Sequence, residues 1–182
     1  MKPVNIFAIA SFASLSLCIS AAAVADTKAE IDAHVNESLK QFHALNSNNQ
    51  SLENKAAGVL IFPSVTKGGV GIAGEYGEGV LKVKGKTVGY YSVTSASVGL
   101  TIGVGTRSEI LMFNTQAALN NFTSSKGWSI GADAGVAVLS KGGGGDYDTQ
   151  TLQKPIVGFV YGEKGLIADL SLEGSKINKL DK

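Results

Sequence analysis

The chain has few of the residues from which catalytic and metal sites are usually built. Its 182 residues include one cysteine and two histidines. With one cysteine, no disulfide can form within the chain, and no cysteine pair is available to hold a metal ion. The formal net charge of +1 provides no general attraction to nucleic acid, so we expect no nucleic-acid partner. Glycine is abundant instead, with 23 residues.

The sequence does not supply a complete catalytic centre. The residues around Ser129 match the nucleophile elbow of hydrolases, but an alternating strand pattern follows, and His34 and His43 both precede the serine. The two histidines are not aligned on a helix, and no cysteine or carboxylate pair completes a metal site with them. Asp133 and Asp169 occupy the minor faces of apolar strands, where each either lines a polar cleft or faces water. We therefore expect no enzyme, no cofactor and no metal ion.

Residues 1–25 have the pattern of an export signal. Lys2 provides a minimal positive charge, residues 4–17 are mostly apolar, and a small-x-small site ends at Ala25. An uncleaved membrane anchor is the alternative, but the many Ser and Ala residues and the charged sequence that begins at Asp26 favour cleavage. We expect a signal peptide cleaved after Ala25 and a periplasmic or secreted protein.

Cys18 raises a second alternative, a lipoprotein acylated on this cysteine. That processing normally requires a small residue before the cysteine, and Leu17 is bulky, so the sequence favours ordinary cleavage. Cleavage after Ala25 removes the cysteine and one of the 16 basic residues, which leaves equal numbers of basic and acidic side chains. Attraction to an anionic surface must then come from a local group of charges.

Residues 26–50 are predicted to form an N-terminal amphipathic helix. Thr27 and Glu30 have the spacing of a capping box, in which each side chain satisfies a free backbone N–H of the first turn. Apolar residues then recur every three or four positions on one helical face, namely Ile31, Val35, Leu39, Phe42 and Leu45. The asparagine-rich residues 46–49 end the helix. The apolar face must pack on another part of the chain, most simply on the domain that follows.

From residue 55 to the end, the sequence predicts one glycine-rich β domain. A short apolar strand from Val59 to Phe62 is expected to stop at Pro63, and a glycine-rich turn follows it. Glycine inside a strand usually marks a bulge, a bend or the close approach of another backbone. Six of the twelve residues from Gly68 to Gly79 are glycines, so we expect strands that bend and pack closely. The same run contains a bare dinucleotide fingerprint, but no helix can follow it, so we reject nucleotide binding.

Further strands and two hairpins follow. Lys84, Gly85 and Lys86 separate two apolar runs and predict one hairpin turn, and residues 162–165 predict another. Thr115 is placed to cap a central helix. Apolar patterns predict strands at 100–104, 110–113, 128–138, 155–161 and 166–172. The expected fold is α+β, a curved, glycine-rich, mostly antiparallel sheet that is sandwich-like or barrel-like, with an N-terminal helix and one central helix.

Short blocks of residues 55–182 form a series of recognisable motifs. They are Gly58–Val65, Gly74–Leu81, Val88–Ser92, Ala117–Leu119 with Phe122, Gly127–Trp128, Pro155–Phe159, Lys164–Leu166 and Leu170–Gly174. In this order they resemble bacterial proteins of the SYLF family. The resemblance implies a SYLF-like lipid-binding domain over residues 55–182. Eukaryotic members bind acidic phosphoinositide membranes and some bundle actin, but an exported bacterial protein would meet no actin of its own.

Two departures from the family pattern concern the ligand. Many relatives carry glutamines near residues 100–106, where this chain has Thr101 and Thr106. The eukaryotic pattern Trp-Ser-Ala-Pro is replaced by residues 90–92, Tyr-Tyr-Ser. Both argue against transferring a phosphoinositide specificity. What the resemblance implies for this chain is binding to phospholipid headgroups or a membrane surface in a bacterial envelope.

The candidate contact residues lie around the first hairpin. Lys82, Lys84 and Lys86 alternate with other residues, which predicts three ammonium groups on one face, with Lys67 near them in the preceding glycine-rich turn. Tyr90 and Tyr91 are expected to be exposed and would suit a membrane interface. The alternative is a solvated strand face on which lysines protect an edge. We predict non-enzymatic binding of acidic phospholipid, and the alternative function is a structural or partner-binding envelope protein with incidental lipid affinity.

Overall fold

The computed structural model describes residues 26–182 with short gaps. The residues outside the description are 1–25, 132, 134, 140–146, 148, 163–164, 167–171 and 173. For residues 70–72, 97–103 and 165–166 the backbone is described and the side chains are not. The predicted signal peptide, Cys18 and Asp169 therefore lie outside the described part of the chain.

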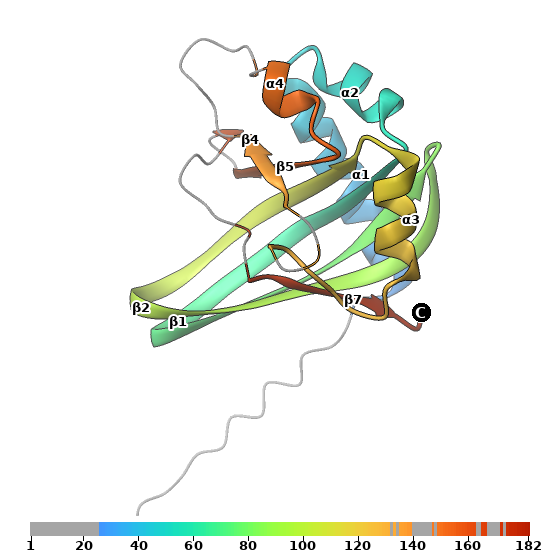
Figure 1. The fold of residues 1–182 in the computed structure, drawn as a ribbon. Helices are drawn as coiled ribbons and strands as arrows, with labels where there is room; N and C mark the ends of the chain where they lie inside the picture. Colours follow the sequence, from blue (N-terminus) through green and yellow to red (C-terminus); the bar gives the residue numbers. More distant parts are fainter. Residues whose placement is uncertain are drawn as a thin grey trace, which may run out of the picture.

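Two very long strands dominate the fold (Figure 1). Strand β1 spans Gly58–Val83 and β2 spans Lys86–Phe113, and they pair with each other in antiparallel fashion. Lys84 and Gly85 form the turn between them, both with positive φ angles of 50° and 75°. Two successive residues with positive φ match the right-handed twist of the flanking strands, so the predicted first hairpin is confirmed.

The expectation that the first strand stops at Pro63 is wrong. β1 continues through the proline because the pairing register shifts between Phe62 and Val65, and a proline is tolerated at such an irregularity. Lys67 and the glycines that follow therefore lie within the strand and not in a turn. Glycines bend this strand without ending it.

The remaining strands extend β2 on its second edge. They are β3 (Trp128–Ser129), β4 (Ala137–Leu139), β5 (Ile156–Gly162), β6 (Gly165–Leu166) and β7 (Lys176–Leu180). The order is β3-β7-β2-β5-β4, with β1 paired to β2 and β6 paired to β5. Only β4 and β5 pair in parallel among these described strands, so the predicted α+β fold with a curved, mostly antiparallel sheet is confirmed.

One predicted strand is broken in two. Residues 128–138 were expected to form a continuous strand, but β3 ends at Ser129. Gly131 follows with a φ of 96°, and Asp133 closes a turn by accepting a hydrogen bond from the Ser129 amide at 2.5 Å. The second predicted hairpin is confirmed by the antiparallel pairing of β5 with β6, in which Tyr161 pairs with Leu166 and Gly162 with Gly165.

Helices cover the sheet. Those expected are α1 (Lys28–Leu45) and α3 (Gln116–Ser124), and those not expected are α2 (Asn49–Lys55) and α4 (Thr149–Leu152). Thr27 and Glu30 form the predicted capping box, and Thr115 accepts a hydrogen bond from the Ala118 amide as the N-cap of α3. The buried Asn49 at the start of α2 donates to the Phe42 carbonyl at 2.6 Å and so ties α2 to α1.

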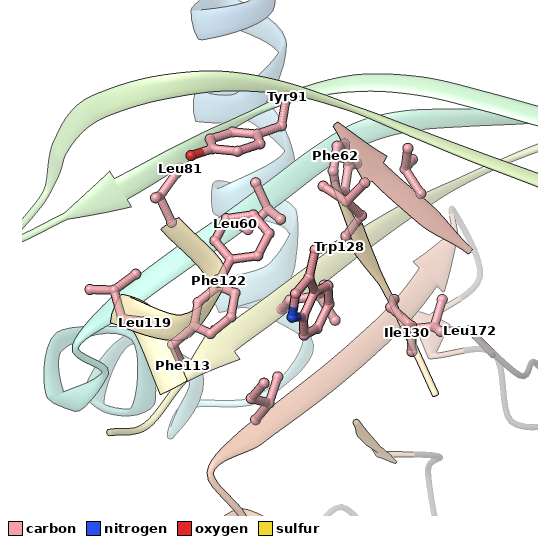
Figure 2. Close-up of a cluster of buried hydrophobic side chains, with 14 of the residues drawn as sticks. Leu60, Phe62, Leu81, Tyr91, Phe113, Leu119, Phe122, Trp128, Ile130 and Leu172 are labelled. Carbon is pink, nitrogen blue, oxygen red and sulfur yellow. The ribbon is translucent and has the colours of Figure 1, made fainter. Parts of the chain in front are cut away.

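The core consists of two apolar clusters on the two faces of the sheet. The inner cluster joins β1 and β2 to α3, β3, β5 and β7 and includes the aromatic rings of Phe113, Phe122 and Trp128 (Figure 2). The outer cluster joins the apolar face of α1 to the sheet through Ile31, Val35, Leu39 and Phe42, with Phe159 below them. The predicted packing stripe of the N-terminal helix is confirmed by this contact.

The glycines of β1 allow the strand to fold against itself. A Cβ placed on Gly79 would lie 2.0 Å from the carbonyl oxygen of Ile61, and one on Gly77 would lie 2.7 Å from that of Ser64. A Cβ on Gly74 would meet nothing within 4 Å. The two halves of β1 therefore touch near Gly79 and diverge toward Gly74. We call this line of contact the seam, and it confirms the expectation that these strands bend and approach closely.

Candidate functional site

The predicted basic hairpin forms the exposed end of β1 and β2. The register shifts between the pairs Leu81–Gly89 and Lys82–Thr87, which leaves Val88 without a partner on the opposite strand. Its side chain is 54% exposed, one of the few large apolar residues open to solvent among those described. Lys84 and Lys86 are exposed as well. We call residues 82–88 the hairpin tip.

The three tip lysines do not share one face, contrary to the prediction. Lys82 is opposite Thr87 and faces α1, where its Nζ donates to Asn36 Oδ1 at 3.0 Å. Lys86 is opposite Val83, which packs against the inner cluster on the other side of the sheet. Simple alternation fails because Lys84 and Gly85 form a two-residue turn, after which Lys86 pairs with Val83 and not with Lys82. Among the described residues, none of the three ammonium groups is paired with a carboxylate.

Lys67 does not belong to the tip, so its expected proximity is wrong. It lies in β1 opposite Gly105, and its Nζ is 3.5 Å from Glu75 Oε1. Glu75 is seven positions before Lys82 on the same strand, a separation of about 23 Å at 3.3 Å per residue.

The two tyrosines are held by the fold rather than left exposed. Tyr91 is 6% exposed and stacks at 5.0 Å on Phe122 in the inner cluster (Figure 2), and burial raises its pKa. Tyr90 is half-buried and donates to Asp32 Oδ2 at 2.9 Å, with Lys28 Nζ 5.7 Å from its ring centroid. The expectation of an exposed Tyr91 is wrong, because alternate residues of β2 point into the core.

A buried ionic cluster lies between the two halves of the folded hairpin, and the sequence patterns did not predict it. Arg107 Nη2 is 2.6 Å from Glu75 Oε2 and 2.7 Å from Glu109 Oε1. Ser95 donates to Glu75 at 2.7 Å, and Lys67 completes the cluster. The exposed fractions of the Arg107, Glu75 and Glu109 side chains are 7%, 8% and 3%. The only sequence signal was the presence of charged residues at inward positions of a strand.

The two carboxylates of this cluster have opposite pKa shifts. Burial alone would raise the pKa of Glu75, but hydrogen bonds from Arg107 and Ser95 and the charges of Arg107 and Lys67 outweigh it, so the pKa is lowered. Burial dominates at Glu109 and raises its pKa despite the same arginine. The arrangement is that of a structural cross-link between strand segments, because Arg107 and Lys67 from one half of the hairpin both bind Glu75 from the other half.

A cleft of about 550 Å³ opens beside this cluster, where the seam diverges. One wall comes from β1 residues 63–66 and the other from residues 74–78. The start of α1 closes a third side with Asp26, Ile31 and His34. Tyr76 is 50% exposed and donates to Glu78 Oε1 at 2.7 Å; burial of its hydroxyl and this carboxylate raise its pKa to about 12. Lys182 donates to Glu78 Oε2 at 2.6 Å and also to the Asp26 carbonyl.

The other predicted positions lie apart from the tip and from each other. Asp133 is exposed and caps its own turn, so it faces water. His43 is bound to Glu53 at 2.5 Å, whereas His34 lines the cleft. Over the described residues, no three His, Cys, Asp or Glu side chains are grouped so that they could hold a metal ion. No described helix is both long enough and apolar enough to cross a membrane.

Comparison with known proteins gives one family match. Residues 94–182 match the family model Ysc84, described as Las17-binding protein actin regulator. The matched segment begins within β2 and includes α3 and all the later elements of the sheet. No curated protein matches the chain significantly. The match confirms the family resemblance seen in the sequence, which is the SYLF family, over this segment.

Proposed function

Residues 94–182 of the chain belong to the Ysc84 (SYLF) family, a family of binding proteins, and from this we propose that the chain binds acidic phospholipid at a membrane surface without catalysis. The contact is made by the hairpin tip. Three features support this proposal: the charge of the tip, its shape and the apolar residue beside it.

The charge of the tip is the observation that carries the proposal. Lys82, Lys84 and Lys86 lie within five residues, and Lys82 is bound only to the neutral Asn36 amide in the described structure. Each lysine near an anionic surface contributes about 1 kcal/mol, so three contribute about 3 kcal/mol at low salt. This attraction falls with salt because the charges are exposed and the Debye length shortens.

The distribution of the lysines suits an end-on approach. Lys82 and Lys86 project from opposite faces of the two-stranded ribbon, and Lys84 occupies the turn between them. A flat surface that meets the ribbon from the side would contact one of the outer lysines, whereas a surface that meets its end can contact all three. Val88, bulged beside them, would then face the headgroup region, where an apolar side chain is stabilised.

Vesicle cosedimentation at low salt tests the proposal. The wild type should bind vesicles that contain anionic phospholipid and should not bind purely zwitterionic ones. Lys84→Glu with Lys86→Glu should weaken binding at least about 100-fold, since two attractions of about 1 kcal/mol each become repulsions. Lys126→Glu with Lys176→Glu is the matched control, because both lysines are exposed but lie beside β3 and on β7. Equal binding by the two double variants would refute the tip as the contact.

A second candidate function is binding of a protein partner. The description of the matched family names binding to Las17 and regulation of actin, which are protein interactions. If the chain is exported, as its first 25 residues predict, actin is not an expected partner, and the partner would be an envelope protein. Saturable capture of one such protein together with no vesicle binding would favour this function over lipid binding.

A further inference from the structure

We infer that the cleft beside the seam is a binding site for a neutral saccharide, held by hydrogen bonds and by contact with the ring of Tyr76. This inference goes beyond the lipid-binding proposal and does not depend on it. It rests on the size of the cleft, on the pairing of the charges beside it, and on the groups that its walls leave open to a ligand.

The cleft has the size of a small-molecule site. Its volume of about 550 Å³ lies within the range of about 300–1,000 Å³ that ligand pockets usually have. Two of its walls are segments of β1, residues 63–66 and 74–78, and the start of α1 forms the third. A site lined by elements of regular structure is largely formed before the ligand binds.

The buried charges beside the cleft are already paired, which argues against a strongly charged ligand. The Glu75 side chain is 8% exposed and is bound by Arg107 and Lys67. The Glu78 side chain is also 8% exposed and is bound by Lys182. Neither carboxylate is free to bind a cation, and their positive partners are not free to bind an anion. A ligand must therefore be held mainly by hydrogen bonds and by apolar contact.

The exposed polar side chains of the cleft suit a ligand rich in hydroxyl groups. Ser64, Thr66 and His34 are exposed, line the cleft and have no hydrogen-bond partner among the described residues. Hydroxyl and imidazole groups can donate as well as accept, and the exposed carboxylate of Asp26 accepts. The hydroxyl groups of a sugar also do both, so one saccharide can pair with groups on several walls of the cleft.

Tyr76 supplies an aromatic surface that is held in place. It is 50% exposed, although its hydroxyl donates to Glu78 Oε1 at 2.7 Å. Glu78 is bound in turn through its other oxygen by Lys182 at 2.6 Å, so the ring is anchored at its far end. Its raised pKa of about 12 keeps this hydroxyl protonated, and the anchor intact, at neutral pH. The C–H groups of a sugar ring can pack against such an aromatic side chain.

Gly74 leaves the space beside this ring open. Alternate residues of a strand share a face, so Gly74 lies on the same face of β1 as Tyr76. It lines the cleft, and a Cβ at this position would meet no atom within 4 Å. Its φ is not positive, so a larger residue can be introduced without backbone strain, and its side chain would occupy the cleft.

The experiment is an NMR titration of the ¹⁵N-labelled protein with three neutral trisaccharides: cellotriose, maltotriose and triacetylchitotriose. At least one should cause saturable shifts of the backbone amides, centred on residues 64–66 and 74–78. Tyr76→Ala should weaken its binding at least about tenfold, whereas Tyr76→Phe, which retains the ring, should weaken it less. Gly74→Leu should abolish binding because the new side chain fills the cleft. Val104→Ala, at an exposed position of β2 outside the cleft, is the matched control and should bind as the wild type does.

The inference would be overturned by the absence of saturable shifts with all three saccharides, or by shifts centred on another surface such as residues 82–88. Equal shifts with glycerol, at the same concentration of hydroxyl groups, would mean unspecific contact and would also refute it. Unchanged binding by Gly74→Leu would place the saccharide outside the cleft. Vesicle binding by the variants at positions 74 and 76 should equal that of the wild type, because the hairpin tip is unaltered. Failure of the saccharide site can therefore be distinguished from failure of the lipid-binding proposal.

Discussion

The seam of β1 predicts that two neighbouring glycines respond in opposite ways to the same substitution. In Gly79→Ala the new Cβ would lie 2.0 Å from the Ile61 carbonyl oxygen, whereas ordinary contacts begin at 3.4 Å. The two halves of β1 would have to separate by about 1.4 Å, and the atom in the way belongs to the backbone and cannot rotate aside. Overpacking costs typically 1–3 kcal/mol, and we expect the upper end, about 3 kcal/mol.

The matched variant is Gly74→Ala in the same strand. Its Cβ meets no atom within 4 Å, and its φ is not positive, so the new side chain fits. Replacing a glycine under these conditions stabilises by about 0.4–1 kcal/mol through the unfolded state. Thermal unfolding of both variants should separate their midpoints by roughly 6–15 °C, with Gly79→Ala lower. Midpoints that coincide, or a lower midpoint for Gly74→Ala, would refute the close approach at the seam.

Further expectations concern the core, the ionic cluster and the first 25 residues. Tyr91→Ala should destabilise by about 3–5 kcal/mol in urea unfolding, as for other buried aromatic residues, and a loss below about 1 kcal/mol would contradict its burial. Arg107→Ala should lower the free energy of unfolding by about 3–5 kcal/mol at pH 7, because it leaves the buried carboxylates of Glu75 and Glu109 without their positive partner. The loss should be smaller near pH 4, where these carboxylates take up protons. An equal loss at both pH values would argue against this cause. The lowered pKa of Glu75 contributes stability that is present above pH 4.5 and lost as the pH falls below it. In Glu75→Gln the free energy of unfolding should therefore depend less on pH in this range. A pH dependence equal to that of the wild type would exclude the contribution. Exported protein should begin at Asp26 by N-terminal sequencing, and an acylated N-terminus at Cys18 would establish the lipoprotein instead.

The sequence predicted most elements whose signal is local. Capping residues and helical spacing located α1 and α3, and the dipeptide Lys84–Gly85 located the first hairpin. The glycines between Gly68 and Gly79 correctly indicated close packing of strands. These predictions depend on neighbouring residues alone, which is why they could be made without the fold.

The candidate site was harder to predict because it depends on register. Period-two alternation placed three lysines on one face, but the two-residue turn pairs Lys86 with Val83 and so places Lys82 and Lys86 on opposite faces. Because β1 folds on itself, Lys67 lies beside Glu75 and not beside the tip, and Arg107 reaches Glu75 as well. Such long-range contacts leave no spacing pattern in the sequence, so neither the ionic cluster nor the cleft could be found there.

The central claim, that the hairpin tip meets the membrane, is tested most directly by an environment-sensitive fluorophore attached to a single cysteine. Val88→Cys places it at the tip, and Val104→Cys places it at another exposed position of β2, where the native side chain is 80% exposed. Cys18 is replaced by serine in both proteins, so that each has one thiol. When vesicles containing anionic phospholipid are added, emission from position 88 should shift to the blue and emission from position 104 should not. A shift at position 104 with none at position 88 would contradict the account.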